Sequence, residues 1–152
     1  MTRVSPTSPP VLSAEQIEVW RTMQRAQMRI TRSIESDLLE SHDLAMASYD
    51  VLLQLSEAPY KRLRMNDLAD RVLLSRSGLT RLIDRLQRDG LVERQACPSD
   101  ARGLYAVLTD KGTALLDEAT PTYLRGVRAQ FVERLSGAEL GQCAALAVKL
   151  VH

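Results

Sequence analysis

Apolar residues recur at the three- and four-residue spacing of an α-helix along most of the chain. The first such series begins after Ser13 and continues to about Glu40. Ser13 and Gln16 have the spacing of a capping box, in which each side chain accepts a hydrogen bond from the other residue's backbone N–H. A helix of roughly 25 residues would be about 38 Å long. This length exceeds what a small lobe needs and favours packing against a partner.

The hydrophobic period changes several times between residues 59 and 108. Residues 63–65 indicate a very short strand, a helix follows Asn66, and Ser75 caps a second helix. In this second helix the apolar residues are spaced i, i+3, i+4 and i+7, namely Leu79, Leu82, Ile83 and Leu86. Gly90 follows, where a left-handed residue ends a helix. Residues 91–95 and 104–108 are strand-like, and the turn formers between them predict a β-hairpin with an extended loop.

Long helical patterns resume after the hairpin. Thr109 is the expected cap of a helix that Pro121 should kink or break, and Ser136 begins the last helix. We therefore expect a mainly α fold with a small β-hairpin wing. Residues 1–12, with three prolines, are expected to be a disordered arm before a single domain over 13–152. Within it, 13–58 and 109–152 supply mainly dimerisation helices, and 59–108 forms a winged helix-turn-helix lobe.

Composition agrees with one helical domain. Apolar residues make up 45% of the 152 residues and aromatic residues 4%, which is typical of a core of Leu, Ala, Val and Ile. No secretory signal or membrane span is apparent, and the two cysteines suggest no disulfide framework, so a cytoplasmic protein is expected. We predict no cofactor and no metal. His42 with Asp43 is a lone pair at a helix junction, where a turn or cap is the usual explanation.

Charge is unevenly distributed although the net charge is only +1. Between Lys61 and Arg102 there are ten basic and six acidic residues, so this segment carries +4 and the remainder −3. A basic lobe on an acidic scaffold favours a local anion-binding face, although charge clusters are often only solvated surface.

The order of strand, helix, turn, helix and hairpin is that of a winged helix-turn-helix, whose second helix enters the DNA major groove. In the helix after Ser75, a rotation of 100° per residue places Arg81, Asp84 and Arg88 away from the apolar face. Arginine recognises guanine edges, and hydroxyls bond bases or phosphates. Alone, this helix face would be ordinary solvated surface, but the flanking helix and hairpin favour DNA binding. The residues expected to bind DNA are Ser75, Arg76, Ser77, Thr80, Arg81, Arg85 and Arg102.

At these positions the sequence resembles the multiple antibiotic resistance regulator (MarR) family of bacterial regulators. The matching residues are Leu68-Ala69, Leu73, Ser75, Ser77, Thr80-Arg81, Asp84-Arg85-Leu86, Gly90-Leu91-Val92, Arg94, Asp100-Ala101-Arg102-Gly103, Leu108-Thr109 and Gly112. The resemblance implies a homodimer, a palindromic operator in double-stranded DNA, and repression relieved by a small aromatic or anionic effector. It also implies that Arg102 enters the minor groove and that Asp100 supports it within the wing.

An enzyme is disfavoured because the sequence has no glycine-rich phosphate loop, no catalytic motif and only two histidines. A protein-binding adaptor would need an apolar or acidic recognition face, whereas this one is largely basic. Cys97 in the wing is either an oxidant sensor or, as we favour, a structural thiol. Trp20 and Tyr49 are candidates for the effector crevice, and core packing explains them equally well.

Overall fold

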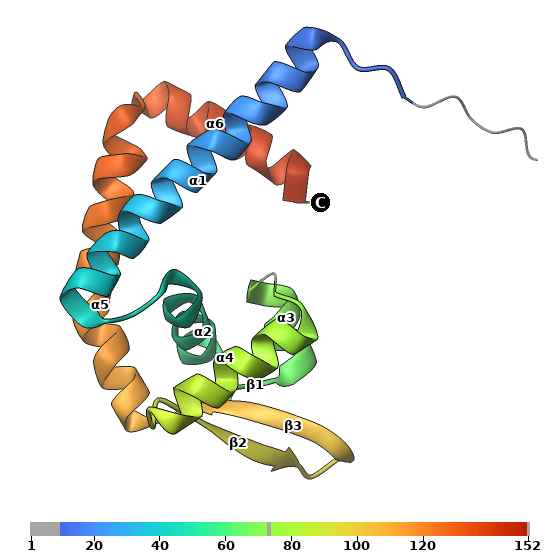
Figure 1. Ribbon diagram of the computed structural model, residues 1–152, viewed down its shortest axis with the longest axis vertical. Coiled ribbons are helices and arrows are strands. Elements are labelled where there is room, and N and C mark those ends of the chain that lie inside the picture. The colour runs from blue at the N-terminus through green and yellow to red at the C-terminus, as the bar shows by residue number, and fades with distance from the viewer. Residues whose placement is uncertain (1–9, 73, 152) are drawn as a thin grey trace, which may run out of the picture.

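The computed structural model (Figure 1) describes residues 10–72 and 74–151, without the side chains of residues 100 and 101. Its main elements are α1 (Ala14–His42), α2 (Met46–Glu57), β1 (Arg62–Arg64), α3 (Met65–Val72), α4 (Arg76–Arg88), β2 (Val92–Cys97), β3 (Asp100–Leu108), α5 (Asp110–Gln130) and α6 (Gly137–Val151). The fold is mainly α-helical with a small antiparallel sheet, which confirms the predicted fold class. Residues 10–12 form neither helix nor strand, while the rest of the predicted arm, 1–9, and Leu73 lie outside the described residues.

The helix caps form where the sequence places them. Ser13 and Gln16 make both hydrogen bonds of a capping box, with N···O distances of 2.9 and 3.1 Å. Thr109 caps α5 by accepting from the Gly112 N–H at 3.0 Å. The first helix is longer than expected: it continues through His42, whose Nε2 lies 2.9 Å from the Thr122 hydroxyl of α5. This contact ties the end of α1 to α5.

Helix α5 is continuous through Pro121, so of the expected kink or break the break does not occur. Leu116 and Ala119 before the proline and Gly126 after it are buried, and packing on both sides holds the helix together. Gly126 is required for the close approach of α5 to α1, because a Cβ at this position would lie 2.9 Å from Cγ1 of Ile34. The two helices therefore run side by side along the second half of α1 (Figure 1).

The sheet has the strand order β1-β3-β2, and β2 and β3 form the wing. The prediction of an extended loop between the two strands of the wing is wrong. Pairing continues to Cys97 and Asp100, so only residues 98 and 99 connect the strands. The register shifts beyond the pair Ala96–Leu104, and residues 101–103 form an irregular bulge in β3. Such bulges redirect side chains at sheet edges, which explains why a segment rich in turn formers still belongs to a strand.

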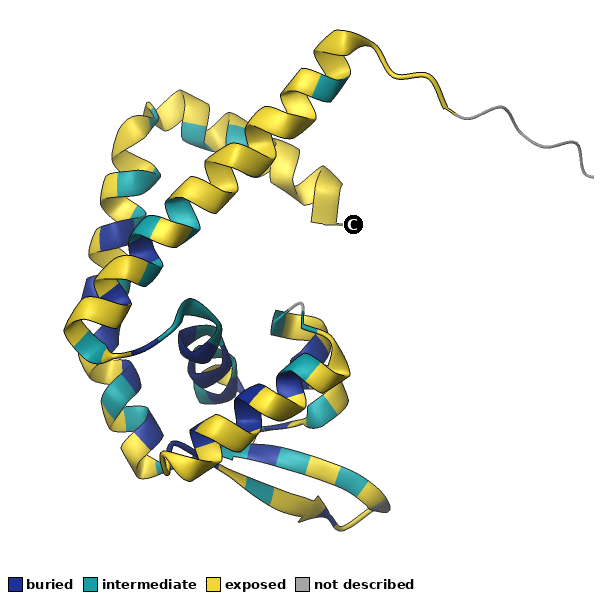
Figure 2. Ribbon diagram, in the orientation of Figure 1, coloured by how far each residue is buried: buried dark blue, intermediate teal, exposed yellow. Residues whose placement is uncertain are grey.

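Burial differs sharply between parts of the molecule. The core joins α2, α3, α4 and the sheet to the C-terminal half of α1 and to α5. No residue of α6 is buried, and the only buried residues of α1 are Ile34 and Leu38. Figure 2 shows this contrast, with dark blue on α2, α4, α5 and the end of α1, and none on α6 or the upper part of α1. None of the helices within the described ranges is long and apolar enough to cross a membrane.

Candidate nucleic-acid interface

Helix α4 is built to present one polar face. Ser75 caps it, accepting a hydrogen bond from the Gly78 N–H at 3.0 Å. The four apolar residues at helical spacing, Leu79, Leu82, Ile83 and Leu86, are all buried. Burying these side chains fixes the rotation of the helix about its axis, because each contributes about 1.5–3 kcal/mol when removed from water. The opposite side of the helix must therefore face solvent.

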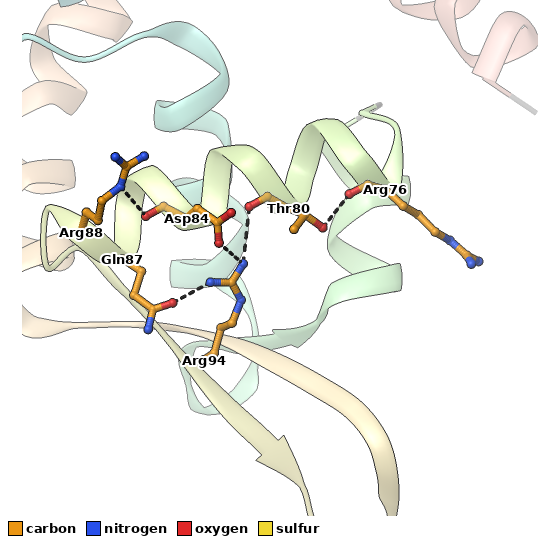
Figure 3. Close-up of polar contacts among 6 residues, drawn as sticks. All are labelled: Arg76, Thr80, Asp84, Gln87, Arg88 and Arg94. Carbon is orange, nitrogen blue, oxygen red and sulfur yellow. Dashed lines mark hydrogen bonds and ion pairs between the residues drawn. The ribbon is translucent and has the colours of Figure 1, made fainter.

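The residues expected to bind DNA lie on this exposed side. Those on or just before α4 are all solvent-exposed, namely Ser75, Arg76, Ser77, Thr80, Arg81 and Arg85. The Thr80 hydroxyl donates to the Arg76 carbonyl at 2.9 Å, and the Ser75 and Ser77 hydroxyls lie 3.3 Å apart. In Figure 3 the Arg76 side chain extends away from the helix. The face thus offers guanidinium and hydroxyl groups around the helix N-terminus, where backbone N–H donors also point outward.

Arg94 on β2 fastens the wing to this helix, a role that the sequence analysis missed. Its Nη1 donates to Oε1 of Gln87 at 2.6 Å, and its Nη2 donates to Oδ1 of Asp84 at 2.7 Å and to the Thr80 carbonyl at 3.4 Å (Figure 3). The Arg94 side chain is only 22% exposed and that of Asp84 is 52% exposed. Asp84 is therefore exposed as predicted but engaged in an ion pair. The signal that could have found it is the alternation along β2, which puts Arg94 on the same side of the strand as the buried Val92.

A hollow of about 280 Å³ separates the N-terminal half of α4 from the wing. Its walls include Thr80 of α4 and three arginines, Arg64, Arg94 and Arg102. Because Thr80 and Arg102 line the same hollow, the structure brings together two predicted DNA-binding positions that are far apart in sequence. The concentration of guanidinium groups suits an anionic partner.

Arg102 is exposed and lies within the bulge of β3. The Asp100 side chain, its predicted support, lies outside the described residues. The turn of the wing is held by Arg64 of β1, which donates to the Ser99 hydroxyl at 3.1 Å. Arg62 stacks on the Tyr105 ring of β3, with its guanidinium carbon 4.4 Å from the ring centre. Strand β1 thus braces the wing from its outer edge.

A second candidate site is a groove of about 550 Å³ between α1, α2, α5 and α6. Tyr49 does not line it. This side chain is 1% exposed, stacks on Tyr123 with ring centres 4.4 Å apart, and bonds the Thr120 hydroxyl at 3.2 Å. Tyr123 itself is in the wall, and Tyr49 packs behind it. Trp20 is 63% exposed and is not part of the lining either. The structure does not bring the two aromatic residues together.

The two cysteines lie in different surroundings. Cys97 is buried at the wing, with 4% of its surface exposed, while Cys143 is half-buried in the wall of the groove. Redox-sensing cysteines are accessible to oxidants. Burial therefore favours the structural interpretation of Cys97.

Comparison with known proteins agrees with this geometry. The sequence model of the MarR family matches residues 42–103. A helix-turn-helix-type transcriptional regulator of Bacillus cereus is 31% identical over 94 residues, which are 62% of this chain and 60% of that protein. The crystal structure of Sco3205, a MarR family transcriptional regulator from Streptomyces coelicolor in complex with DNA, is 31% identical with a TM-score of 0.87. That match covers 94% of this chain and 90% of Sco3205.

Bordetella bronchiseptica BpsR, whose DNA binding is regulated by 6-hydroxynicotinic acid, has the same fold. It is 23% identical with a TM-score of 0.79, covering 89% of this chain and 99% of that one. Fold and site together define a winged helix-turn-helix protein. With the matches to the family model and to Sco3205, the chain belongs to the MarR family of transcriptional regulators.

Proposed function

We propose that this protein is a cytoplasmic homodimeric repressor that binds a palindromic operator and responds to a small ligand. The observation that carries the proposal is the exposed hydroxyl and guanidinium face of α4, held beside Arg102 across one basic hollow. In this function α4 enters the major groove, and Arg102 enters the adjacent minor groove, where a narrow A·T-rich segment concentrates negative potential. No catalytic step is part of it.

Contact chemistry supports DNA as the partner. Arg76, Arg81 and Arg85 are exposed on α4 and carry the fork of donors that matches guanine O6 and N7 or a phosphate. Ser75 and Ser77, at the N-terminal end, are suited to phosphate oxygens. The similar fold of Sco3205 is seen bound to DNA. The contacts of Arg94 with Asp84 and Gln87, here called the Arg94 clasp, set the angle between the wing and α4 in the free protein. Both surfaces can then contact the duplex together.

Uncovered apolar surface supports a homodimer. Trp20 is 63% exposed on α1, and Leu146 and Leu150 are 60% and 72% exposed on α6. Such clusters usually mark an interface, and a two-fold dimer through α1, α5 and α6 would cover them. Two α4 helices would then reach successive major grooves about 10 base pairs apart.

The groove between α1, α2, α5 and α6 supports ligand response, because three of these helices are proposed for the dimer and the fourth, α2, packs against α3 and β3 of the winged lobe. The aromatic rings of Tyr123 and Phe131 in its walls suit an aromatic effector. BpsR, whose DNA binding is regulated by 6-hydroxynicotinic acid, provides the parallel for such regulation. Ligand and DNA would be coupled reciprocally, so saturating operator should lower ligand affinity by the same factor as ligand lowers DNA affinity.

The test is selection of binding sites from random DNA with the purified protein. We expect a palindrome with half-sites about 10 base pairs apart, and repression when it overlaps a promoter in a purified transcription assay. Arg102→Ala should weaken binding and make the salt dependence shallower by up to about one charge, with dimerisation unchanged. Enrichment of no sequence would refute the proposed function. Unaltered affinity and salt slope in Arg102→Ala would place the wing outside the interface.

A further inference from the structure

The groove between α1, α2, α5 and α6 has walls of mostly apolar character with a single charged side chain. Apolar surface is provided by Ile30 of α1, Met46 of α2, Val127 of α5 and Phe131, which directly follows α5. Asp50 of α2 is the only Asp, Glu, Lys or Arg in the lining given by the described residues. Its carboxylate therefore determines the local charge of the groove.

Asp50 has no polar partner within the described part of the protein. It is half-buried, and no hydrogen bond or ion pair joins its carboxylate to another side chain or to the backbone. Burial raises the pKa of Asp50, and no cation among the described residues opposes that rise. The other carboxylate close by, Glu35, already accepts a hydrogen bond from the Met46 N–H at 2.8 Å.

An unpartnered carboxylate in an apolar groove is unfavourable, because partial loss of hydration is not repaid by a counter-charge. The same arrangement favours a ligand that brings a positive charge. Aromatic faces add to that preference, since a cation within about 6 Å of a ring centre is attracted by the ring quadrupole. Tyr123 and Phe131 supply two rings in the same walls.

We propose that this groove binds a small organic cation with an apolar or aromatic body, and that the Asp50 carboxylate selects for its charge. An anion of the kind named for BpsR would meet a like charge here. Binding follows from the groove alone, whereas the consequence that the cation regulates DNA binding rests on the proposed function. A second copy of the chain is the competing occupant, because α1 and α6 both border the groove.

Two probes of the same shape and different charge separate these possibilities. Phenyltrimethylammonium carries +1, and tert-butylbenzene replaces its nitrogen with carbon. Calorimetric titration of the full-length protein without DNA should give an affinity for the cation about tenfold higher than for the neutral probe. Asp50→Asn should remove that preference and keep the affinity for tert-butylbenzene. Asp117→Asn, which removes an exposed charge on α5, is the matched control and should leave both affinities unchanged.

Wild-type protein measured with both probes tests the proposal even if a variant folds poorly. Equal affinity for the two probes, an undiminished preference in Asp50→Asn, or tighter binding of benzoate would each overturn it. Failure of both probes to bind up to millimolar concentration would also overturn it and would leave the second copy as occupant. Operator binding is measured separately on the free protein. Protein that binds the cation but no DNA would support the cation site while refuting the proposed function.

Discussion

The winged lobe and the long helices cover their apolar side chains in different ways. In the winged lobe, the inner faces of α3 and α4 are sealed: Leu68 and Ile83 are 0% exposed, and Leu79 is 1% exposed. Outside this lobe, Trp20 of α1 and Leu150 of α6 are 63% and 72% exposed. Apolar residues on helices are thus buried within the protein in one region and left on open surface in the other.

This difference separates two physical tasks. The winged lobe fixes the orientation of its recognition face through its own packing and through the Arg94 clasp. The N-terminal half of α1 and all of α6 gain little burial within one chain, and a helix without tertiary contacts is only marginally stable in water. Their order is therefore expected to depend on a second copy, whereas that of the winged lobe does not.

The largest effect on stability is expected from a substitution in the buried core of the winged lobe. Ile83→Ala should lower the free energy of unfolding by about 2–5 kcal/mol, because it removes buried methyl groups and leaves a cavity. Denaturant unfolding at a fixed protein concentration measures it, since the stability of a dimer depends on concentration. Leu104→Ala in the wing, where the side chain is 43% exposed, should change the value by less than about 1 kcal/mol. Equal losses would contradict the contrast in burial.

Substitutions among the exposed apolar residues of α1 and α6 should change dimerisation. Trp20→Glu combined with Leu146→Glu should raise the dimer dissociation constant at least about a hundredfold, because charges would be buried at the proposed interface. Sedimentation across a micromolar concentration series measures this shift. Thr22→Glu adds the same charge on the polar side of α1, where Thr22 bonds Glu18, and should leave the dimer intact. A wild-type monomer at micromolar concentration would remove the dimer from the proposal.

Sequence preference should depend on the winged lobe alone. Arg81→Ala should cost about 1–3 kcal/mol on the selected operator and relax the preference at one base position, with assembly unchanged. Binding measured on the operator and on random duplexes separates a base contact from a phosphate contact. Equal losses on both duplexes would make Arg81 a phosphate contact.

The smallest effect on stability is expected at the clasp. A double-mutant cycle of Asp84→Ala and Arg94→Ala should give a coupling energy below about 1 kcal/mol in unfolding, because Asp84 is 52% exposed. The same cycle measured by operator affinity should give the larger coupling, since the pair sets the angle of the wing. A coupling confined to unfolding would show that the clasp has no part in DNA recognition.

The element order, the family and the exposed face of α4 follow from the amino-acid sequence. These follow from local rules: helical period places Leu79 and Ile83 inward, hydroxyl residues such as Ser13 and Ser75 cap helices, and Gly90 takes a left-handed conformation with φ of 75°. Each rule involves residues that are close in the chain, so it holds whatever the tertiary packing is. The named DNA-binding residues were obtained in this way, and their roles remain predictions.

Contacts between segments that are distant in the chain follow from the tertiary structure and not from local sequence. The Arg94 clasp joins β2 to α4, and strand pairing carries the wing out to Cys97 although residues 98–103 favour turns. Tyr49 and Trp20 are both aromatic residues on predicted helices, yet one is sealed behind Tyr123 and the other is exposed. The isolation of Asp50 is also a tertiary property. The carboxylate lacks a counter-ion because the side chains that surround it come from distant segments of the chain. No local sequence pattern indicates which side chains these are.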